Sequence, residues 1–156
     1  MTSNTYQKLE KLLANGDWKE ADQETAKVML KLAERESEGW LDYDSIKNFP
    51  CEDLRTIDQL WVKYSNGRFG YSVQKNIWLE CGGKIDYETE CKLGDRIGWR
   101  LDQEWMEYDQ GTFSLDAPVG HFPCGGVGGF WCGGGWGVWL WLGGGAVGVL
   151  LSRQEL

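Results

Sequence analysis

The chain has 156 residues, a formal net charge of −8 and five cysteines. This length suits one domain with a sizeable core. The negative charge argues against a nucleic acid or an anionic membrane as the main partner. The cysteines are odd in number, contain no C-x-x-C pair and follow a polar, charged N-terminal stretch, so we expect free thiols in a reducing compartment.

Helical spacing begins near the N-terminus. Tyr6, Leu9 and Leu13 recur at intervals of three and four, and Asn15-Gly16 is a typical helix stop. Asp17 is a plausible N-cap for a second helix. The apolar stripe of that helix is Ala21, Thr25, Val28 and Leu32. Because the connection is so short, the two helices are expected to lie antiparallel.

A second pair of helices is predicted between residues 48 and 80. Pro50 suits the first position of a helix, where its missing N–H has no cost. The apolar face of this helix is Leu54, Ile57, Trp61 and Tyr64. Asn66-Gly67 ends the helix because both residues tolerate positive φ. Ser72 is the expected N-cap of the next helix, over 73–80.

The remaining helical signal ends near residue 109. A helix is expected from Tyr87 to Leu93, ending near Gly94, and no segment between 75 and 109 alternates as a strand should. We therefore predict an all-α fold in a single domain, residues 1–156. It has a helical bundle over 1–109 and a flexible, Gly/Trp-rich ligand loop within 110–156.

The last third differs in composition. Between Ala117 and Ser152 His121 is the one ionisable side chain other than cysteine thiols, and tryptophans alternate with glycines. A membrane-spanning helix is disfavoured because the glycine runs 133–135 and 143–145 would interrupt it. Peripheral contact of exposed tryptophans with a membrane is the better alternative.

No catalytic or metal-binding constellation is evident. Gly143, Gly145 and Gly148 spell G-x-G-x-x-G, but the βαβ unit that this fingerprint requires is missing. The spacing of His121, Cys124 and Cys132 matches no zinc pattern. With one histidine, hydrolytic triads and histidine-rich metal sites are nearly excluded. We expect a binding protein without a protein-bound metal.

The composition suits a flat, apolar ligand with anionic edges. Such a ligand needs aromatic and aliphatic walls for its faces, with cations or backbone N–H groups at its rim. Glycines let the backbone approach a planar ring closely. The chain supplies ten tryptophans and 22 glycines.

The run FPCEDLRTIDQLWVKYSNGRFGYSVQ (49–74), with GDRIGWR (94–100), GHFP (120–123) and LLSR (150–153), resembles the genomes-uncoupled family from about Tyr6 to Arg153. Members of that family bind tetrapyrroles and activate magnesium chelatase in chlorophyll synthesis. The resemblance implies a non-enzymatic regulator that binds protoporphyrin IX and Mg-protoporphyrin IX and acts on the large porphyrin-binding subunit of magnesium chelatase. We expect a monomer in a cyanobacterial cytoplasm, with part of the pool at membranes.

The resemblance also implies a shallow apolar groove between the FGYSVQ segment and a loop near the C-terminus. Its expected residues are Val62, Phe69, Tyr71, Val73, Phe130 and Trp131, with Arg153 pairing with a propionate. Val62, Phe69 and Tyr71 are equally compatible with a core position, and Arg153 with a solvated chain end.

Two thiols border this loop, Cys124 and Cys132. Either could add to a vinyl or ethylidene group of a linear tetrapyrrole and form a thioether, or both could be inert. One alternative function is therefore a bilin-binding pigment carrier or sensor that takes phycocyanobilin or biliverdin. Another is a helical adaptor whose Trp-rich tail binds protein or membrane.

Overall fold

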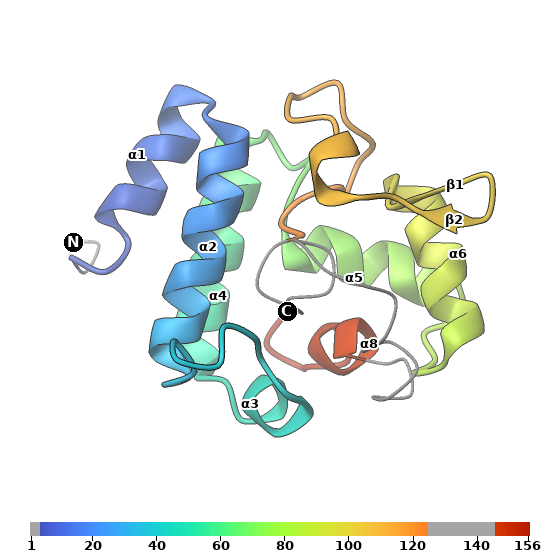
Figure 1. Ribbon diagram of the computed structural model, residues 1–156, viewed down its shortest axis with the longest axis horizontal. Coiled ribbons are helices and arrows are strands. Elements are labelled where there is room, and N and C mark those ends of the chain that lie inside the picture. The colour runs from blue at the N-terminus through green and yellow to red at the C-terminus, as the bar shows by residue number, and fades with distance from the viewer. Residues whose placement is uncertain (1–3, 125–145) are drawn as a thin grey trace.

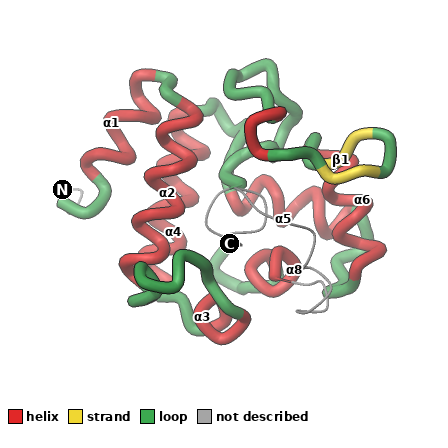
Figure 2. Tube along the Cα trace, in the orientation of Figure 1, coloured by secondary structure: helices red, strands yellow, loops and turns green. Residues whose placement is uncertain are grey.

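The computed structural model describes residues 4–124 and 146–156. Helices dominate these residues, so the predicted all-α class is confirmed (Figures 1 and 2). The α-helices are α1 (Gln7–Asn15), α2 (Trp18–Leu32), α3 (Tyr43–Lys47), α4 (Cys51–Tyr64), α5 (Tyr71–Glu80), α6 (Tyr87–Ile97) and α8 (Ala146–Leu151). Two short strands, β1 (Arg100–Leu101) and β2 (Glu104–Trp105), and a 3₁₀ turn, η1 (Tyr108–Gln110), follow α6.

Helices α1 and α2 form the predicted pair. Gly16 ends α1 with φ of 76°, and its N–H donates to the carbonyls of Leu12 and Leu13. Glycine is favoured at this position because it adopts the left-handed backbone conformation without steric cost. Asp17 is the N-cap of α2, but it acts through its backbone carbonyl, which accepts from the N–H of Ala21 at 2.8 Å. In Figure 1 α2 stands beside α1 and in front of α4.

An aromatic cluster fills the space between α2, α4 and the chain near residue 122. Its rings belong to Trp18, Trp61, Phe69 and Phe122, with centroids 5.2–6.4 Å apart. The indole N–H of Trp61 would be costly to bury alone. It donates to the hydroxyl of Thr25 at 3.0 Å, and that hydroxyl donates to the carbonyl of Ala21. The indole N–H of Trp61 and the hydroxyl of Thr25 are thereby both paired.

The observed elements differ from the predicted ones in three ways. Helix α6 does not end near Gly94; it continues to Ile97 and ends at Gly98, where φ is 79°. The expectation of no strand between 75 and 109 is wrong, because β1 and β2 pair antiparallel as a hairpin. Pro50 is the N-cap of α4 and lies one residue before the helix.

The hairpin explains why glycine stands inside α6. A Cβ on Gly94 would lie 2.5 Å from the ring of Trp105 in β2. The two turn residues, Asp102 and Gln103, have φ of 51° and 69°. Positive φ at both central positions is typical of a two-residue type I′ turn, whose twist matches that of the paired strands. Strands of two residues are too short to show alternation in the sequence.

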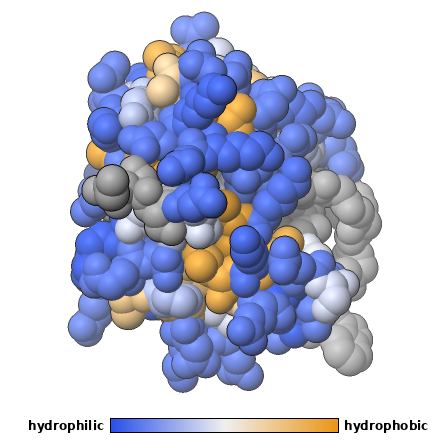
Figure 3. Space-filling model, turned by 90° about the vertical axis from the view of Figure 1, so that its left-hand side faces the viewer, coloured by the Kyte–Doolittle hydropathy of each residue, from blue (hydrophilic) through white to orange (hydrophobic). Residues whose placement is uncertain are grey.

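The surface is mainly hydrophilic on the face shown in Figure 3, with a smaller apolar band near its centre. Among the helices that the structure describes, none is long and apolar enough to cross a membrane. Within the same residues, no group of three or more His, Cys, Asp and Glu side chains is placed to hold a metal ion.

The contact between Gly94 and Trp105 gives a test of this packing. Alanine normally stabilises a helix interior by about 1 kcal/mol relative to glycine. We expect Gly94→Ala instead to lower the free energy of unfolding by about 1–3 kcal/mol, because the added methyl overlaps the indole. Urea unfolding followed by circular dichroism measures this change.

The matched control is the same substitution in a Trp105→Leu background. With the indole gone, Gly94→Ala should cost less stability than in the parent, because only the contact of 3.1 Å with Cγ of Arg100 remains. A Gly94→Ala single variant at least as stable as the parent would contradict the described packing.

Candidate functional site

The corner between α4 and α5 is where the structure brings two of the predicted groove residues together. Val62 on α4 and Val73 on α5 are both half-buried. Between them, Gly70 has φ of 141°, and a Cβ there would lie 2.7 Å from a methyl of Val62. A side chain at position 70 is therefore excluded by backbone conformation and by space. The corner presents two partly exposed apolar side chains over a glycine that is itself buried.

Phe69 and Tyr71 flank Gly70 but point inward. Neither has exposed surface. Phe69 packs against Trp18, Trp61 and Phe122, and the hydroxyl of Tyr71 donates to the sulfur of Met29 at 3.0 Å. In this structure both side chains support the corner from within and present no surface to a ligand.

A buried carboxylate holds the start of α5. Ser72, the predicted N-cap, lies inside the helix, which begins at Tyr71 with Gly70 as N-cap. The prediction of Ser72 was wrong because the cap comes from another helix: Oδ1 of Asp58 accepts from the N–H of Ser72 at 2.8 Å. Asp58 is 7% exposed, and burial raises its pKa while hydrogen bonds from Ser72 and Tyr71 oppose that rise. A negative charge here faces the positive end of α5.

A loop segment, residues 117–124, crosses this corner, and we call it the strap. The N–H of Gly70 donates to the carbonyl of Phe122 at 3.0 Å, and the N–H of Gly120 donates to the carbonyl of Arg68 at 2.8 Å. The amide nitrogen of Gln74, on α5, donates to the carbonyls of Gly120 and Pro123, each at 2.9 Å. The strap is thus fixed to both sides of the corner.

A second buried carboxylate fixes the end of the strap. Asp22 on α2 has no exposed surface. Its oxygens accept from the N–H of Cys124 at 2.8 Å, from the thiol of Cys124 at 3.2 Å and from the hydroxyl of Tyr108 at 2.9 Å. Asp22 thus holds Cys124 at the end of the strap.

Arg153 uses its donors inside the protein. Its guanidinium forms an ion pair with Glu155 and donates to the carbonyl of Ile46 at 2.9 Å, with the sulfur of Cys51 3.4 Å away. Its side chain is 9% exposed. Lys75 on α5 donates to the backbone carbonyl of Arg153 at 2.6 Å. The guanidinium therefore anchors the C-terminal segment to α3 and α4, and a propionate would have to displace Glu155.

The remaining predicted residues, Phe130, Trp131 and Cys132, lie outside the described residues.

Sequence reasoning missed the polar anchors Asp22, Asp58 and Gln74. A signal for the two carboxylates exists. Asp22 follows Ala21 on the buried stripe of α2, and Asp58 follows Ile57 on that of α4. A carboxylate at a buried helical position needs a hydrogen-bonding partner from elsewhere.

Comparison with protein families matches residues 1–136 to the family described as GUN4-like. The chain is 36% identical over 121 residues to a Ycf53-like protein of Synechocystis sp., covering 76% of this chain and 50% of that protein. It is 32% identical over 134 residues to a protein of Arabidopsis thaliana named tetrapyrrole-binding protein, chloroplastic, covering 78% of this chain and 49% of that protein. The chain therefore spans about half the length of these relatives.

Two solved structures share the fold. The ligand-free structure of Arabidopsis thaliana GUN4 matches with a TM-score of 0.77 at 26% identity, over 99% of this chain and 96% of that one. The structure of GUN4 from Chlamydomonas reinhardtii matches with a TM-score of 0.67 at 35% identity, over 79% of this chain and 83% of that one.

Two aspartates, Asp58 and Asp86, accept hydrogen bonds from backbone N–H groups in the first turns of α5 and α6. Their contributions to stability should respond to pH in opposite directions. The pKa of Asp58 is raised by burial above its usual 3.8, so the stability it contributes is present below that value and is lost as the pH rises through its folded pKa. The pKa of Asp86 is lowered by its hydrogen bond from the N–H of Thr89, so its contribution is present above 3.8 and lost as the pH falls through its folded pKa.

Unfolding free energies of the parent, Asp58→Asn and Asp86→Asn between about pH 3 and about pH 7 measure both effects. Relative to its asparagine variant, the parent should lose stability with rising pH at position 58 and gain it at position 86. Slopes of the same sign at the two positions would contradict the assigned environments.

Proposed function

This chain belongs to the GUN4-like family, and we propose that it binds a tetrapyrrole at the corner between α4 and α5. The observation that carries this proposal is the pair of half-buried valines, Val62 and Val73, on the two helices that meet at Gly70. The name of the Arabidopsis relative, tetrapyrrole-binding protein, supports the same ligand class.

In this proposal affinity comes from burying the faces of the macrocycle against apolar side chains. Burying roughly 500 Å² of apolar ligand surface would contribute on the order of 12 kcal/mol before the costs of association. The entropy lost when ligand and protein associate and become ordered offsets a large part of this free energy. We therefore expect a Kd in the micromolar range or tighter. Phe69, Tyr71 and the strap hold the wall rigid, and no axial protein ligand is required.

We propose protoporphyrin IX and Mg-protoporphyrin IX as the ligands, and magnesium chelatase, through its large porphyrin-binding subunit, as the partner. The chain would act as a regulator that delivers substrate or removes product, not as an enzyme. Because the chain has a net charge of −8, its surface would attract a basic face of the partner. The similarity to the Synechocystis protein supports a cyanobacterial cytoplasm as its location.

The environment of Cys124 does not favour covalent attachment of a linear tetrapyrrole there. The side chain is 7% exposed, and its thiol donates to the buried carboxylate of Asp22. A thiol that is buried and hydrogen-bonded in this way is not presented to a ligand at the surface. Phycocyanobilin is therefore a useful comparison ligand in the following experiment.

Val73→Asn should weaken binding of Mg-protoporphyrin IX by about tenfold or more, because a polar side chain replaces apolar contact with the ring. Quenching of tryptophan fluorescence during titration measures the Kd. The matched control is Leu79→Asn on the same helix, since Leu79 is 53% exposed and lies on a different face of α5. Its Kd should stay within about twofold of the parent's.

Equal losses in both variants would contradict binding at the corner, and no saturable quenching by any tetrapyrrole would contradict the function itself. Trp131→Ala and Arg153→Ala extend the test to the remaining predicted residues. If phycocyanobilin binds more tightly than Mg-protoporphyrin IX, the bilin-carrier alternative replaces the chelatase regulator.

A further inference from the structure

One arginine of the chain differs from the others in its pairing. The other five each form an ion pair with a carboxylate, and they are Arg35, Arg55, Arg96, Arg100 and Arg153. Arg68, in the turn between α4 and α5, forms no ion pair with the residues that the structure describes. Its Nη2 donates to the carbonyl of Ala117 at 2.7 Å, and its Nε is buried without a hydrogen-bond partner there. A guanidinium has five N–H donors, so the described residues leave most of those of Arg68 unused.

Arg68 belongs to the α4–α5 corner. It precedes Gly70 by two residues, so the Cα atoms of the two residues are at most about 7 Å apart. The carbonyl of Arg68 accepts from the N–H of Gly120 at 2.8 Å, and the N–H of Gly70 donates to the carbonyl of Phe122 at 3.0 Å. The side chain of Arg68 is half-buried. An extended propionate on a macrocycle at the corner is therefore within reach of this guanidinium.

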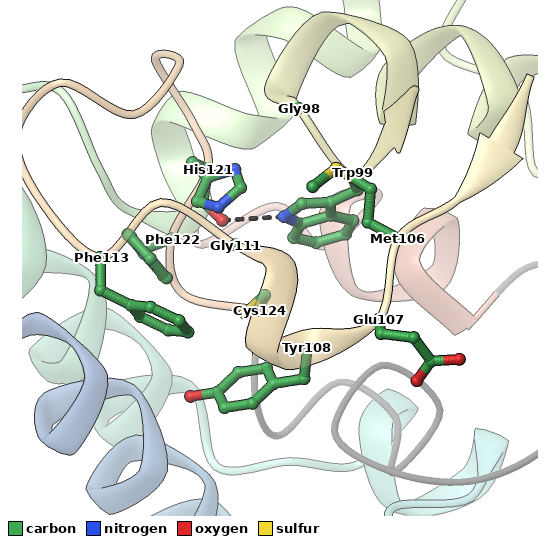
Figure 4. A pocket seen from close by; sticks show the side chains of 10 residues that line it. All are labelled: Gly98, Trp99, Met106, Glu107, Tyr108, Gly111, Phe113, His121, Phe122 and Cys124. Atoms are coloured by element: carbon green, nitrogen blue, oxygen red, sulfur yellow. Dashed lines mark hydrogen bonds between the residues drawn. The ribbon is translucent and has the colours of Figure 1, made fainter. Parts of the chain in front are cut away.

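The strap, to which the guanidinium is bonded, is also fixed to the end of α6 and the residues after it. The indole N–H of Trp99 donates to the carbonyl of His121 at 2.8 Å, as the dashed line in Figure 4 shows. Nδ1 of His121 lies 2.7 Å from the carbonyl oxygen of Ile97. The carbonyl of Ala117, which accepts from Arg68, therefore belongs to a segment that is held in place. A guanidinium oriented before the ligand arrives lowers the entropy cost of binding.

Three other cations on α4, on α5 and in the C-terminal segment are already engaged. The ammonium of Lys63 on α4 lies 3.6 Å from the carboxylate of Glu10. Lys75 on α5 donates to the backbone carbonyl of Arg153 at 2.6 Å, and the guanidinium of Arg153 is paired with Glu155. A ligand carboxylate at any of these three would have to displace or share a partner that the structure describes. At Arg68 it would not.

A buried carboxylate at the corner adds to the need for a cation. Oδ1 of Asp58 lies 2.8 Å from the position that a Cβ on Gly70 would take. Its hydrogen-bond donors at the start of α5, Ser72 and Tyr71, are neutral. When Asp58 is ionised, it repels an anionic ligand at the corner, and water screens such a buried charge poorly. A positive charge in the neighbouring turn offsets this repulsion.

We propose that Arg68 pairs with a propionate of the bound tetrapyrrole. This inference rests on the proposed function and adds the residue that recognises the acid group of the ligand. Nη1 and the second hydrogen of Nη2 donate to the two oxygens of one carboxylate, the bidentate arrangement that arginine favours. The bond from Nη2 to Ala117 is kept. The site therefore distinguishes a free acid from its ester.

The test compares Mg-protoporphyrin IX with its dimethyl ester, which keeps the ring and lacks both carboxylates. Arg68→Gln should raise the Kd of the acid by about tenfold, because charge-assisted hydrogen bonds are lost, and change that of the ester by less than about twofold. The matched control is Lys63→Gln, which removes a positive charge from α4 at a surface ion pair. It should change either Kd by less than about twofold. Quenching of tryptophan fluorescence measures each Kd.

Arg68→Lys gives a second test should Arg68→Gln fail to fold. It keeps the charge but loses the planar fork, so the acid should bind about threefold more weakly and the ester as in the parent.

Equal losses for acid and ester in a folded Arg68 variant would show that Arg68 only supports the strap, and would overturn the proposal. An acid-selective loss in Arg153→Gln, with none in Arg68→Gln, would overturn it as well. If the parent binds neither ligand, the proposed function itself fails. If the parent binds both and the Arg68 variants bind the acid equally well, the pairing alone is wrong.

Discussion

The hydrogen bonds of the strap hold the second half of the chain on the α2–α4–α5 core. Asp22 and Gln74 supply the side-chain bonds, and Gly70 and Arg68 supply backbone ones. Each such bond contributes about 1 kcal/mol, but leaving a buried partner unpaired costs about 1–3 kcal/mol. The anchors are therefore interdependent. They place Phe122 in the aromatic core and hold His121 against it, with Cys124 fixed to Asp22.

Helices with a clear apolar stripe could be predicted from spacing, because burial of one face is a local property of the sequence. The features that were missed depend on distant residues. Asp58 replaced Ser72 as the side chain that caps α5, although the two are fourteen residues apart. Gly94 signalled a helix end, but the ring of Trp105 occupies the place of its side chain. No local pattern encodes either contact.

The candidate site was only partly predictable for a related reason. Spacing and resemblance predicted Val62, Phe69, Tyr71 and Val73 as groove residues, but they cannot say which of these side chains face outward. The structure turns the two aromatic residues into the core and leaves the two valines half-buried. Arg153 lies at the end of the chain in sequence, yet its guanidinium is held by Glu155 and Ile46.

The central claim, a tetrapyrrole on the α4–α5 corner, is tested most directly by amide NMR with diamagnetic Mg-protoporphyrin IX. Ring currents of a bound macrocycle shift nearby resonances strongly and distant ones little. We expect the largest amide chemical-shift changes among residues 4–124 and 146–156 to fall on Val62, Gly70 and Val73. Largest shifts in the β1–β2 hairpin or around His121, with the corner unchanged, would contradict it.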